Sequence, residues 1–315
     1  MHRDRANNVE RALALALDYI LGRQGRDGSW IDWDLPPGQS STWTTAFVGC
    51  KLIGLRSSLR SRASGSIHRA SQWLKDRTFA DNGWGYNDTV ESDADSTALA
   101  ILFLTSAEQS VREGSYACLQ SFQCADGGFA TFRGLPNLGY WAVSHADVTP
   151  SAVLAMMTKY GVESETVDRG LQFIVNRKTL AGIWHSFWWT SYLYSTETSL
   201  HLLRAGGRNL DLRATRKTLL GTRPRHPFES ALLLSSFLCL PDVVEEEHIW
   251  PMVDRLLEDQ QADGSWRSGP LLRVTRRDCL EPWKQGDPDQ LFCDQNRLFT
   301  TATVTETLSK ISLSW

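Results

Sequence analysis

Short turns that combine a glycine with a large aromatic residue recur along the chain, and this repetition constrains the fold more than any other feature. The turn aromatics are Trp30, Trp84, Phe129, Trp184 and Trp266. Recurrence at a period of roughly fifty residues indicates a repeat architecture, in which each unit buries its apolar face against its neighbours. The widest interval, between Trp184 and Trp266, spans a unit in which the turn is missing.

Each repeat pairs an amphipathic helical segment with a more apolar one. In the first repeat, apolar residues from Val9 to Ile20 have helical spacing. The apolar helices are expected over residues 42–55, after Asp95, and over residues 149–158, 196–203, 229–238 and 300–308. Six such pairs bury their apolar helices best when they form a closed ring with those helices inside. The sequence therefore predicts an all-α fold, an (α/α)6 barrel of six helix-hairpin repeats with Gln-Trp turns, as a single domain over residues 1–315. No alternating run predicts a strand.

Composition excludes several classes of protein. With 33 basic and 36 acidic residues the net charge is −3, so the chain has no electrostatic footprint for nucleic acid. The six cysteines are scattered without a CxxC pair and the N-terminal segment is charged throughout, so we expect free thiols, no secretory leader and a cytoplasmic location. No apolar run approaches the length that spans a membrane. The 13 tryptophans supply flat apolar faces that pack well and attract cations.

The second repeat carries the candidate catalytic chemistry. Asp93, Asp95 and Ser96 stand at the start of its apolar helix. Carboxylates this close repel one another and are partly desolvated, and both effects raise a carboxyl pKa and favour the protonated form. A neutral Asp against apolar surface can donate a proton, so these residues predict a Brønsted acid that acts on an apolar substrate. The alternative is a helix N-cap, the commoner role of Asp and Ser at such a position.

In a closed ring the inner helices begin at one end of a central cavity, which gathers further acidic and aromatic residues. The candidate substrate-binding residues near these starts are Trp43, Tyr140, Trp141, Asp147, Trp188, Trp189, Tyr192, Tyr194, Glu197, Phe228, Glu229, Trp283 and Phe299. Several of the aromatic side chains could equally be barrel packing.

Two long connections, residues 133–147 and 267–296, exceed ordinary loop lengths and are candidate lids. The second contains Arg273, Arg276 and Arg277. These arginines could clamp a diphosphate or another anionic head group, and a solvated basic loop is the alternative.

The turns and the acidic segment together resemble the squalene-hopene cyclase and class II terpene cyclase superfamily. The resemblance rests on the Gln-x3-Gly-x-Trp turn at 24–30, on related turns at 123–129 and 261–266, and on GWGY followed by DADSTA. In that family the acidic motif is usually DxDDTA, and its middle Asp protonates a terminal alkene or an epoxide. That position matches Asp95 and the first matches Asp93, while Ser96 stands in place of the third Asp. Full-length triterpene cyclases have two helical barrels and this chain has helices for one, so lids or a partner protomer would close the cavity.

The resemblance implies a class II, protonation-initiated cyclase of terpenes or meroterpenoids. Asp95 would protonate an alkene or an epoxide, and aromatic faces would stabilise the carbocation by about 0.5–2 kcal/mol each. The final proton acceptor stays open among His145, Asp147, Tyr194, Glu197 and water. No metal is implied for the protonation, and Mg²⁺ only if the substrate carries a diphosphate. The expected partner is an isoprenoid or prenylated small molecule, with peripheral membrane contact or a homodimer as further options.

Other functions stay open from the residues. A helical-barrel glycoside hydrolase would use two inner carboxylates as acid and base in an open, wet cleft, whereas a cyclase cavity should be closed and apolar beyond Asp95. A diverged enzyme of the same fold could act on a non-terpenoid metabolite. A zinc prenyltransferase would need spaced Asp, Cys and His ligands, which Asp278–Cys279 and Cys293–Asp294 do not supply. If Asp93 and Asp95 are caps only, the chain is a non-catalytic binding module.

Overall fold

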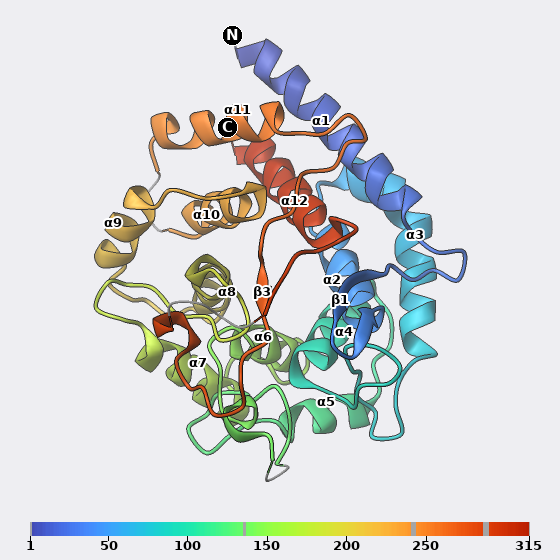
Figure 1. The fold of residues 1–315 in the computed structure, drawn as a ribbon, viewed down its shortest axis with the longest axis vertical. Coiled ribbons are helices and arrows are strands. Elements are labelled where there is room, and N and C mark those ends of the chain that lie inside the picture. Colours follow the sequence, from blue (N-terminus) through green and yellow to red (C-terminus); the bar gives the residue numbers. More distant parts are fainter. Residues whose placement is uncertain (1, 135–136, 241–243, 286–289, 315) are drawn as a thin grey trace.

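The computed structural model describes residues 2–134, 137–240, 244–285 and 290–314, and within these ranges twelve α-helices alternate between two concentric rings (Figure 1). The outer ring contains α1 (His2–Gly22), α3 (Ser57–Lys75), α5 (Glu113–Gln120), α7 (Glu165–Arg177), α9 (Arg213–Gly221) and α11 (Glu246–Glu258). The inner ring contains α2 (Thr42–Ile53), α4 (Ala94–Ser106), α6 (Thr149–Tyr160), α8 (Tyr192–Ala205), α10 (Pro227–Cys239) and α12 (Leu298–Ser314).

The inner ring is closed. Each inner helix packs against the next, and α12 returns to pack against α2. The inner helices are apolar on most faces because they are buried between the lumen and the outer ring. The outer helix α1, which the sequence predicts as amphipathic, covers α12. The predicted all-α, (α/α)6 arrangement is therefore confirmed.

In five of the six repeats an aromatic turn joins the outer helix to its inner partner, which explains why these turns recur. In each turn the aromatic residue donates its backbone N–H to a threonine hydroxyl near the start of the next inner helix, at 2.9–3.4 Å; the pairs are Trp30–Thr45, Trp84–Thr97, Phe129–Thr149, Trp184–Thr196 and Trp266–Thr301. The four indole N–H groups donate to carbonyls near the end of the preceding outer helix, at 2.6–2.8 Å.

The turn glutamines join neighbouring repeats. Gln24 donates to Gly28 and to the carbonyl of Ser66 in the next outer helix, and Gln123 does the same with Gly127 and Thr166. In the last turn the equivalent residue is Gln260, which donates to the carbonyl of Ala12 in α1 and so closes the ring. The sequence register that begins this turn at residue 261 is wrong by one position.

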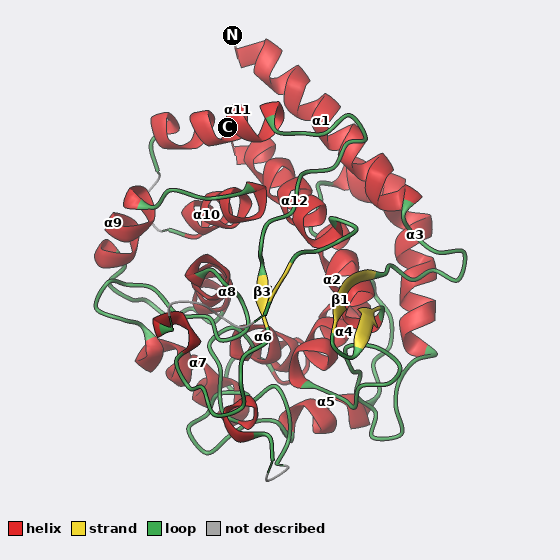
Figure 2. Cartoon of the chain, in the orientation of Figure 1, coloured by secondary structure: helices red, strands yellow, loops and turns green. Residues whose placement is uncertain are grey.

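Two connections between outer and inner helices form short antiparallel ribbons that the sequence does not predict, one between α1 and α2 and one between α11 and α12. β1 (Asp32–Leu35) pairs with β2 (Gly38–Ser40), and β3 (Leu272–Arg273) pairs with β4 (Leu291–Phe292). Figure 2 shows β3 over the centre of the ring, where the backbone N–H of Arg273 donates to the carbonyl of Trp188. Residues 271–274 and 290–292, called the strap below, thus cover the mouth of the barrel.

In connections 133–147 and 267–296, the described residues outside β3 and β4 are irregular apart from two single-turn 3-10 helices, η1 (Gly139–Ala142) and η2 (Pro282–Lys284). The candidate lids 133–147 and 267–296 include residues 135–136 and 286–289, which lie outside the described ranges. Among the helices that the structure describes, none combines the length and the apolar character needed to cross a membrane.

Candidate active site

A cavity of about 190 Å³ lies under the strap, at the N-terminal ends of α2, α4 and α6. Its described lining is mostly apolar and comprises Leu35, Pro36, Pro37, Trp43, Tyr86, Val90, Asp93, Asp95, Ser96, Thr131, Phe132, Trp141, Asp147, Val148, Trp188, Trp189, Leu272, Arg273 and Val274. Three carboxyl groups and one guanidinium are therefore held among aromatic and aliphatic side chains.

Asp93 and Ser96 form the N-terminal cap of α4. Asp93 is 4% exposed and has an extended backbone, and one carboxylate oxygen accepts a 2.7 Å hydrogen bond from the Ser96 backbone N–H. Its other oxygen accepts a hydrogen bond of the same length from the Ser96 hydroxyl. Both the backbone N–H and the hydroxyl of Ser96, a sequence candidate for catalysis, thus donate to Asp93. These two residues have the geometry of a helix N-cap.

Asp95 differs from Asp93 because only one of its oxygens is engaged. Oδ2 accepts a 2.7 Å hydrogen bond from the indole Nε1 of Trp43, whereas Oδ1 is buried and has no partner among the described residues. A carboxylic acid places its proton on the oxygen that accepts no hydrogen bond. The free oxygen of Asp95 is therefore the one able to hold and release a proton.

The surroundings keep Asp95 protonated near neutral pH. Burial, followed by the charge of Asp93, raises the pKa of Asp95 to about 8, against the opposing effect of the Trp43 N–H. Burial also raises the pKa of Asp93 to about 7, although the hydrogen bonds from Ser96 favour its charged form. Desolvation and repulsion by a neighbouring carboxylate, the two effects expected from the sequence, both raise the pKa of Asp95, and desolvation is the larger.

Asp147 is the third carboxyl group of the cavity, and its environment differs from that of Asp95. Oδ2 accepts hydrogen bonds from the backbone N–H groups of Phe187 and Trp188 at 2.8 and 2.7 Å, and Oδ1 is buried without a partner among the described residues. Burial raises the pKa of Asp147 to about 6, while the backbone hydrogen bonds lower it. At pH 7 Asp147 is mostly ionised and Asp95 mostly protonated, so one cavity holds an acid and a base.

Aromatic rings build the walls beside these groups. Trp141 and Trp188 meet edge to face at 5.3 Å between ring centroids, and the Trp188 indole donates to the hydroxyl of Thr131 at 2.7 Å. Trp189 stacks on Tyr194 at 3.9 Å and on Phe228 at 5.3 Å. Such fixed rings present negatively charged faces, which attract a cation.

Several sequence candidates lie behind the wall of the cavity instead of lining it. Tyr194 and Phe228 support Trp189, while Phe299 stacks on Phe47 at 3.8 Å. Tyr140 is 37% exposed at the rim. Each of these residues stands near an inner-helix start as expected, but its ring packs against protein or faces solvent, so the expectation of substrate contact is not met in this cavity.

Glu197 and Glu229 do not line this cavity, and each is paired with a basic side chain. Helix α8 begins at Tyr192, so Glu197 lies in its second turn, where it bonds Ser235 at 2.7 Å and pairs with His201 at 3.2 Å. Glu229 turns back to pair with Arg225. Neither carboxylate is available as a second acid opposite Asp95.

Tyr192 and Trp283 line a neighbouring chamber and not this cavity. The Tyr192 hydroxyl lies 2.7 Å from that of Thr222, and the Trp283 ring stacks on His185 at 4.7 Å. Their contribution to substrate binding can therefore concern only a ligand that extends beyond the cavity.

The three candidate anion-binding arginines separate in the structure. Arg273 is 6% exposed and lines the cavity. Arg276 is exposed and pairs with Asp278 at 3.0 Å. Arg277 is exposed as well, donates to the carbonyl of Asn137 and lies over the Trp141 ring. Arg273 is thus the one of the three that can meet a buried anion.

His145 is a poor candidate for the final proton acceptor. Its ring stacks on Phe187 at 3.9 Å and does not line the cavity. Burial lowers the pKa of His145 to about 3. Of the four side chains considered from the sequence, Asp147 is the one in the cavity wall.

Sequence reasoning missed the part of the lining that comes from loops. Leu35, Pro36 and Pro37 come from the β1–β2 turn, and Leu272 and Val274 come from the strap. The two adjacent prolines were a usable signal, because a rigid apolar turn between an outer and an inner helix must lie at the mouth of the ring.

Comparison with known proteins supports the resemblance. No family model matches the chain. A curated relative, a probable squalene–hopene cyclase from Sinorhizobium fredii (strain NBRC 101917 / NGR234), is 25% identical over 210 residues, which cover 54% of this chain and 32% of the relative. The chain therefore matches about a third of that relative's length.

Solved structures decide the fold. The type II terpene cyclase MstE from Scytonema superposes with a TM-score of 0.84 at 23% identity, over 98% of this chain and 100% of that one. The chain has the fold of the type II terpene cyclases. A more distant match is ent-copalyl diphosphate synthase from Streptomyces platensis, with a TM-score of 0.62 at 14% identity over 85% of this chain and 50% of that one.

Proposed function

We propose that this chain is a class II cyclase, which starts the cyclisation of a prenyl chain by protonating it. The observation that carries the proposal is the environment of Asp95 in the wall of an apolar cavity: Trp43 fixes one carboxyl oxygen, and the other has no partner among the described residues. Burial raises the pKa of Asp95 to about 8, which favours the protonated form. An acid in this setting suits an alkene or an epoxide, which offers no group for stronger polar binding.

The proposed reaction begins when the proton on Asp95 Oδ1 passes to a terminal double bond or epoxide oxygen. A tertiary carbocation forms, and neighbouring double bonds of the folded chain attack in turn, so that each step makes one carbon–carbon bond and moves the positive charge. The faces of Trp188, Trp189 and Trp141 would stabilise that charge by about 0.5–2 kcal/mol each. Folding the substrate against the walls supplies orientation, which is the larger share of such rate enhancements.

Asp147 is the proposed acceptor of the final proton. Its Oδ2 is fixed by two backbone N–H groups, and its Oδ1 has no partner among the described residues. Loss of a proton to Asp147 would quench the cation and leave a product of the same mass as the substrate. Its negative charge also stabilises the preceding cation and raises the pKa of Asp95.

The proposed substrate is a prenylated small molecule. The relatives support this class: one MstE structure holds geranylgeranyl dihydroxybenzoate as its substrate, and that protein matches this chain with a TM-score of 0.85 at 23% identity over 99% of this chain and 100% of that one. The proposed step uses only the Asp95 proton and needs no cofactor, and Mg²⁺ would enter with a diphosphate-bearing substrate.

The same cavity suits a glycoside hydrolase less well. That reaction needs two carboxyl groups facing each other across a wet cleft. Here Asp95 and Asp147 share one cavity, but the rest of its lining is mainly aromatic and aliphatic, and Glu197 and Glu229 are engaged in ion pairs elsewhere. A diverged enzyme acting on a non-terpenoid alkene would use Asp95 in the same way.

The test is incubation of the protein and of its Asp95→Asn variant with four substrates: farnesyl diphosphate, geranylgeranyl diphosphate, squalene and a geranylgeranyl benzoic acid. We expect cyclised isomers of unchanged mass from at least one substrate, and their loss in the variant. Equal product from both proteins would refute Asp95 as the acid. No product from any substrate would refute the prenyl-chain proposal.

A further inference from the structure

Trp33 combines two unfavourable features directly behind the wall of the active site. Its φ is +57°, in the left-handed region that glycine adopts freely and a bulky residue avoids. The residue is fully buried, and its indole Nε1 has no partner among the described residues. A strained backbone and an unmade hydrogen bond both cost free energy, so a large ring kept at this position points to a role in the site that it packs against.

Asp32 holds Trp33 in this conformation. One oxygen of the Asp32 carboxylate, Oδ1, accepts hydrogen bonds from the backbone N–H groups of Trp33 at 2.8 Å and of Asn296 at 2.7 Å. The other oxygen accepts a 2.8 Å hydrogen bond from the backbone N–H of Leu298, the first residue of α12. The side-chain amide of Asn296 in turn donates to the carbonyl of Ile31 at 2.8 Å. The start of β1 is therefore fastened to the start of α12.

The Trp33 ring packs against the ring of Trp43, which lines the cavity. The two ring centroids lie 5.9 Å apart, at an interplanar angle of 37°. Trp33 also meets Phe299 edge to face at 5.1 Å, and the Phe299 ring lies 4.5 Å from that of Trp43. Trp33 and Phe299 thus support the Trp43 ring together. Since Trp43 Nε1 donates to Asp95 Oδ2 at 2.7 Å, close packing of this ring fixes the direction of that hydrogen bond.

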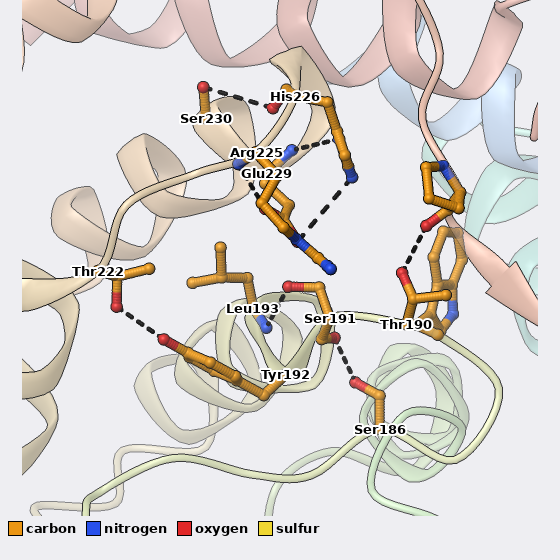
Figure 3. A network of polar contacts seen from close by, with 12 residues as sticks. Ser186, Thr190, Ser191, Tyr192, Leu193, Thr222, Arg225, His226, Glu229 and Ser230 are labelled. Carbon is orange, nitrogen blue, oxygen red and sulfur yellow. Dashed lines mark hydrogen bonds and ion pairs between the residues drawn. The ribbon is translucent and has the colours of Figure 1, made fainter. Parts of the chain in front are cut away.

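Trp189, the other cavity ring that Trp33 meets, has more supports of its own. Trp33 contacts it edge to face at 6.4 Å, and two further aromatic rings stack on it. The next residue, Thr190, is fixed as well, because its hydroxyl donates to the carbonyl of Pro270 at 2.6 Å (Figure 3). Loss of the Trp33 ring should therefore affect Trp43 more than Trp189.

We infer that Trp33 is a positioning residue, which holds the Trp43 indole in the direction that donates to Asp95. The inference rests on the proposed function, since it concerns the acid of that same site. Trp33 is absent from the described lining of the cavity, so it acts on a substrate only through the rings in front of it. Removing the Trp33 ring should leave Trp43 free to tilt and should weaken its hydrogen bond to Asp95.

The test measures the pKa of Asp95 by NMR, so that it does not depend on turnover. Protein labelled with ¹³C at the aspartate carboxyl carbons is titrated, and the Asp95 signal is the one that is missing from Asp95→Asn. The hydrogen bond from Trp43 lowers the pKa of Asp95, so Trp33→Leu should raise this pKa by about half a unit or more. Trp33→Phe should raise it less, because an aromatic ring remains and the lost N–H has no described partner.

The sign of the shift separates positioning from a mere loss of packing. Burial is the largest of the effects that raise the pKa of Asp95, so a void that only admits water would lower this pKa. The charges of Asp93 and Asp147, which also act on Asp95, are the same in every variant. The matched control is Trp250→Leu in the outer helix α11, where an indole Nε1 is likewise buried without a described partner. This control should leave the pKa of Asp95 unchanged.

A double-mutant cycle tests whether Trp33 acts through Trp43. In a Trp43→Phe background the hydrogen bond to Asp95 is already absent, so Trp33→Leu should produce no further rise in the pKa of Asp95. A rise of equal size in both backgrounds would overturn the inference, as would a pKa that stays constant or falls in Trp33→Leu. If Trp33→Leu does not fold, the cycle is run with Trp33→Phe, and the absence of any rise then overturns the inference. Failure of the cyclase proposal would appear separately, as absence of cyclised product from the unsubstituted protein.

Discussion

Replacing Trp43 by phenylalanine tests how the protein sets the strength of its acid. The indole N–H bonds Asp95 Oδ2 at 2.7 Å and so stabilises the carboxylate that remains after proton transfer. A hydrogen bond to a charged group contributes about 1.5–3 kcal/mol, and about 1.36 kcal/mol corresponds to one pKa unit. Loss of the bond should therefore raise the pKa of Asp95 from about 8 by a further one to two units, roughly.

The assay is the pH dependence of kcat for cyclisation. The protonated acid is the active form, so activity falls as the pH rises through the pKa of Asp95. In Trp43→Phe this alkaline limb should move to higher pH, and kcat on the plateau should fall by up to about tenfold per unit, because a weaker acid transfers its proton more slowly.

A matched control is Trp188→Phe, which removes an indole from the same cavity whose N–H bonds Thr131 and not the acid. That variant should lose activity without moving the limb. The role of Trp43 in setting the pKa of Asp95 would be refuted if the alkaline limb of the kcat profile stayed in place in Trp43→Phe, or if it moved equally in both variants.

Three further predictions concern stability. Lys51→Met should destabilise the fold by about 1–3 kcal/mol in urea unfolding, because Glu306 would lose the 2.7 Å ion pair that joins α2 to α12 and keep only its 2.7 Å pair with Lys310. Burial opposes the charged form of His201, but the Glu197 carboxylate raises the pKa of His201 to about 10. The ion pair therefore stabilises the fold fully below pH 6.5, and the free energy of unfolding should fall as the pH rises from 6.5 to 10. The fall should be smaller in His201→Gln. Gly264→Ala should lower the melting temperature, because the turn requires a φ of +88° and the new Cβ would lie 2.3 Å from the Leu15 carbonyl oxygen.

Two of these predictions have a control in the same chain. Gly221→Ala places a methyl group where no atom lies within 4 Å and should leave the melting temperature within a few degrees. The doubly substituted Lys51→Met, Glu306→Leu protein should recover part of the lost stability, since the buried carboxylate that lost one of its two lysine partners is then absent. A stability that rises from pH 6.5 to 10 would contradict the account of His201 and Glu197.

The barrel could be predicted from the sequence because its repeating interactions are local in sequence. A turn aromatic bonds a threonine 12 to 35 residues later, as Trp184 bonds Thr196 and Trp266 bonds Thr301, so both partners recur with the repeat. The ribbons could not be predicted in this way. β3 consists of Leu272 and Arg273 alone, and it is fixed by pairing with β4 and by contacts with Trp188 and Trp189 far away in the chain.

The same distinction explains which site residues could be placed. Asp95 is part of the DADSTA motif and stands in the first turn of α4, so neighbouring residues in the sequence are enough to place it. The sequence pattern predicts a helix from residue 196 and so places Glu197 at its start, whereas α8 begins at Tyr192 and carries Glu197 one turn deeper. Position relative to a helix start also does not tell which partner a carboxylate will meet, as the pairing of Glu229 with Arg225 illustrates.

The most direct test of the central claim is cyclisation in D₂O, with carbon-bound deuterium in the product measured by mass spectrometry. The Asp95 carboxyl proton exchanges with solvent, so each turnover should deliver one deuteron to the carbon or oxygen that is protonated, and a product protonated at carbon should be one mass unit heavier than its substrate. Asp95→Asn should yield no such product. A cyclised product without carbon-bound deuterium from an alkene substrate, or deuterated product from the variant at an undiminished rate, would contradict protonation by Asp95.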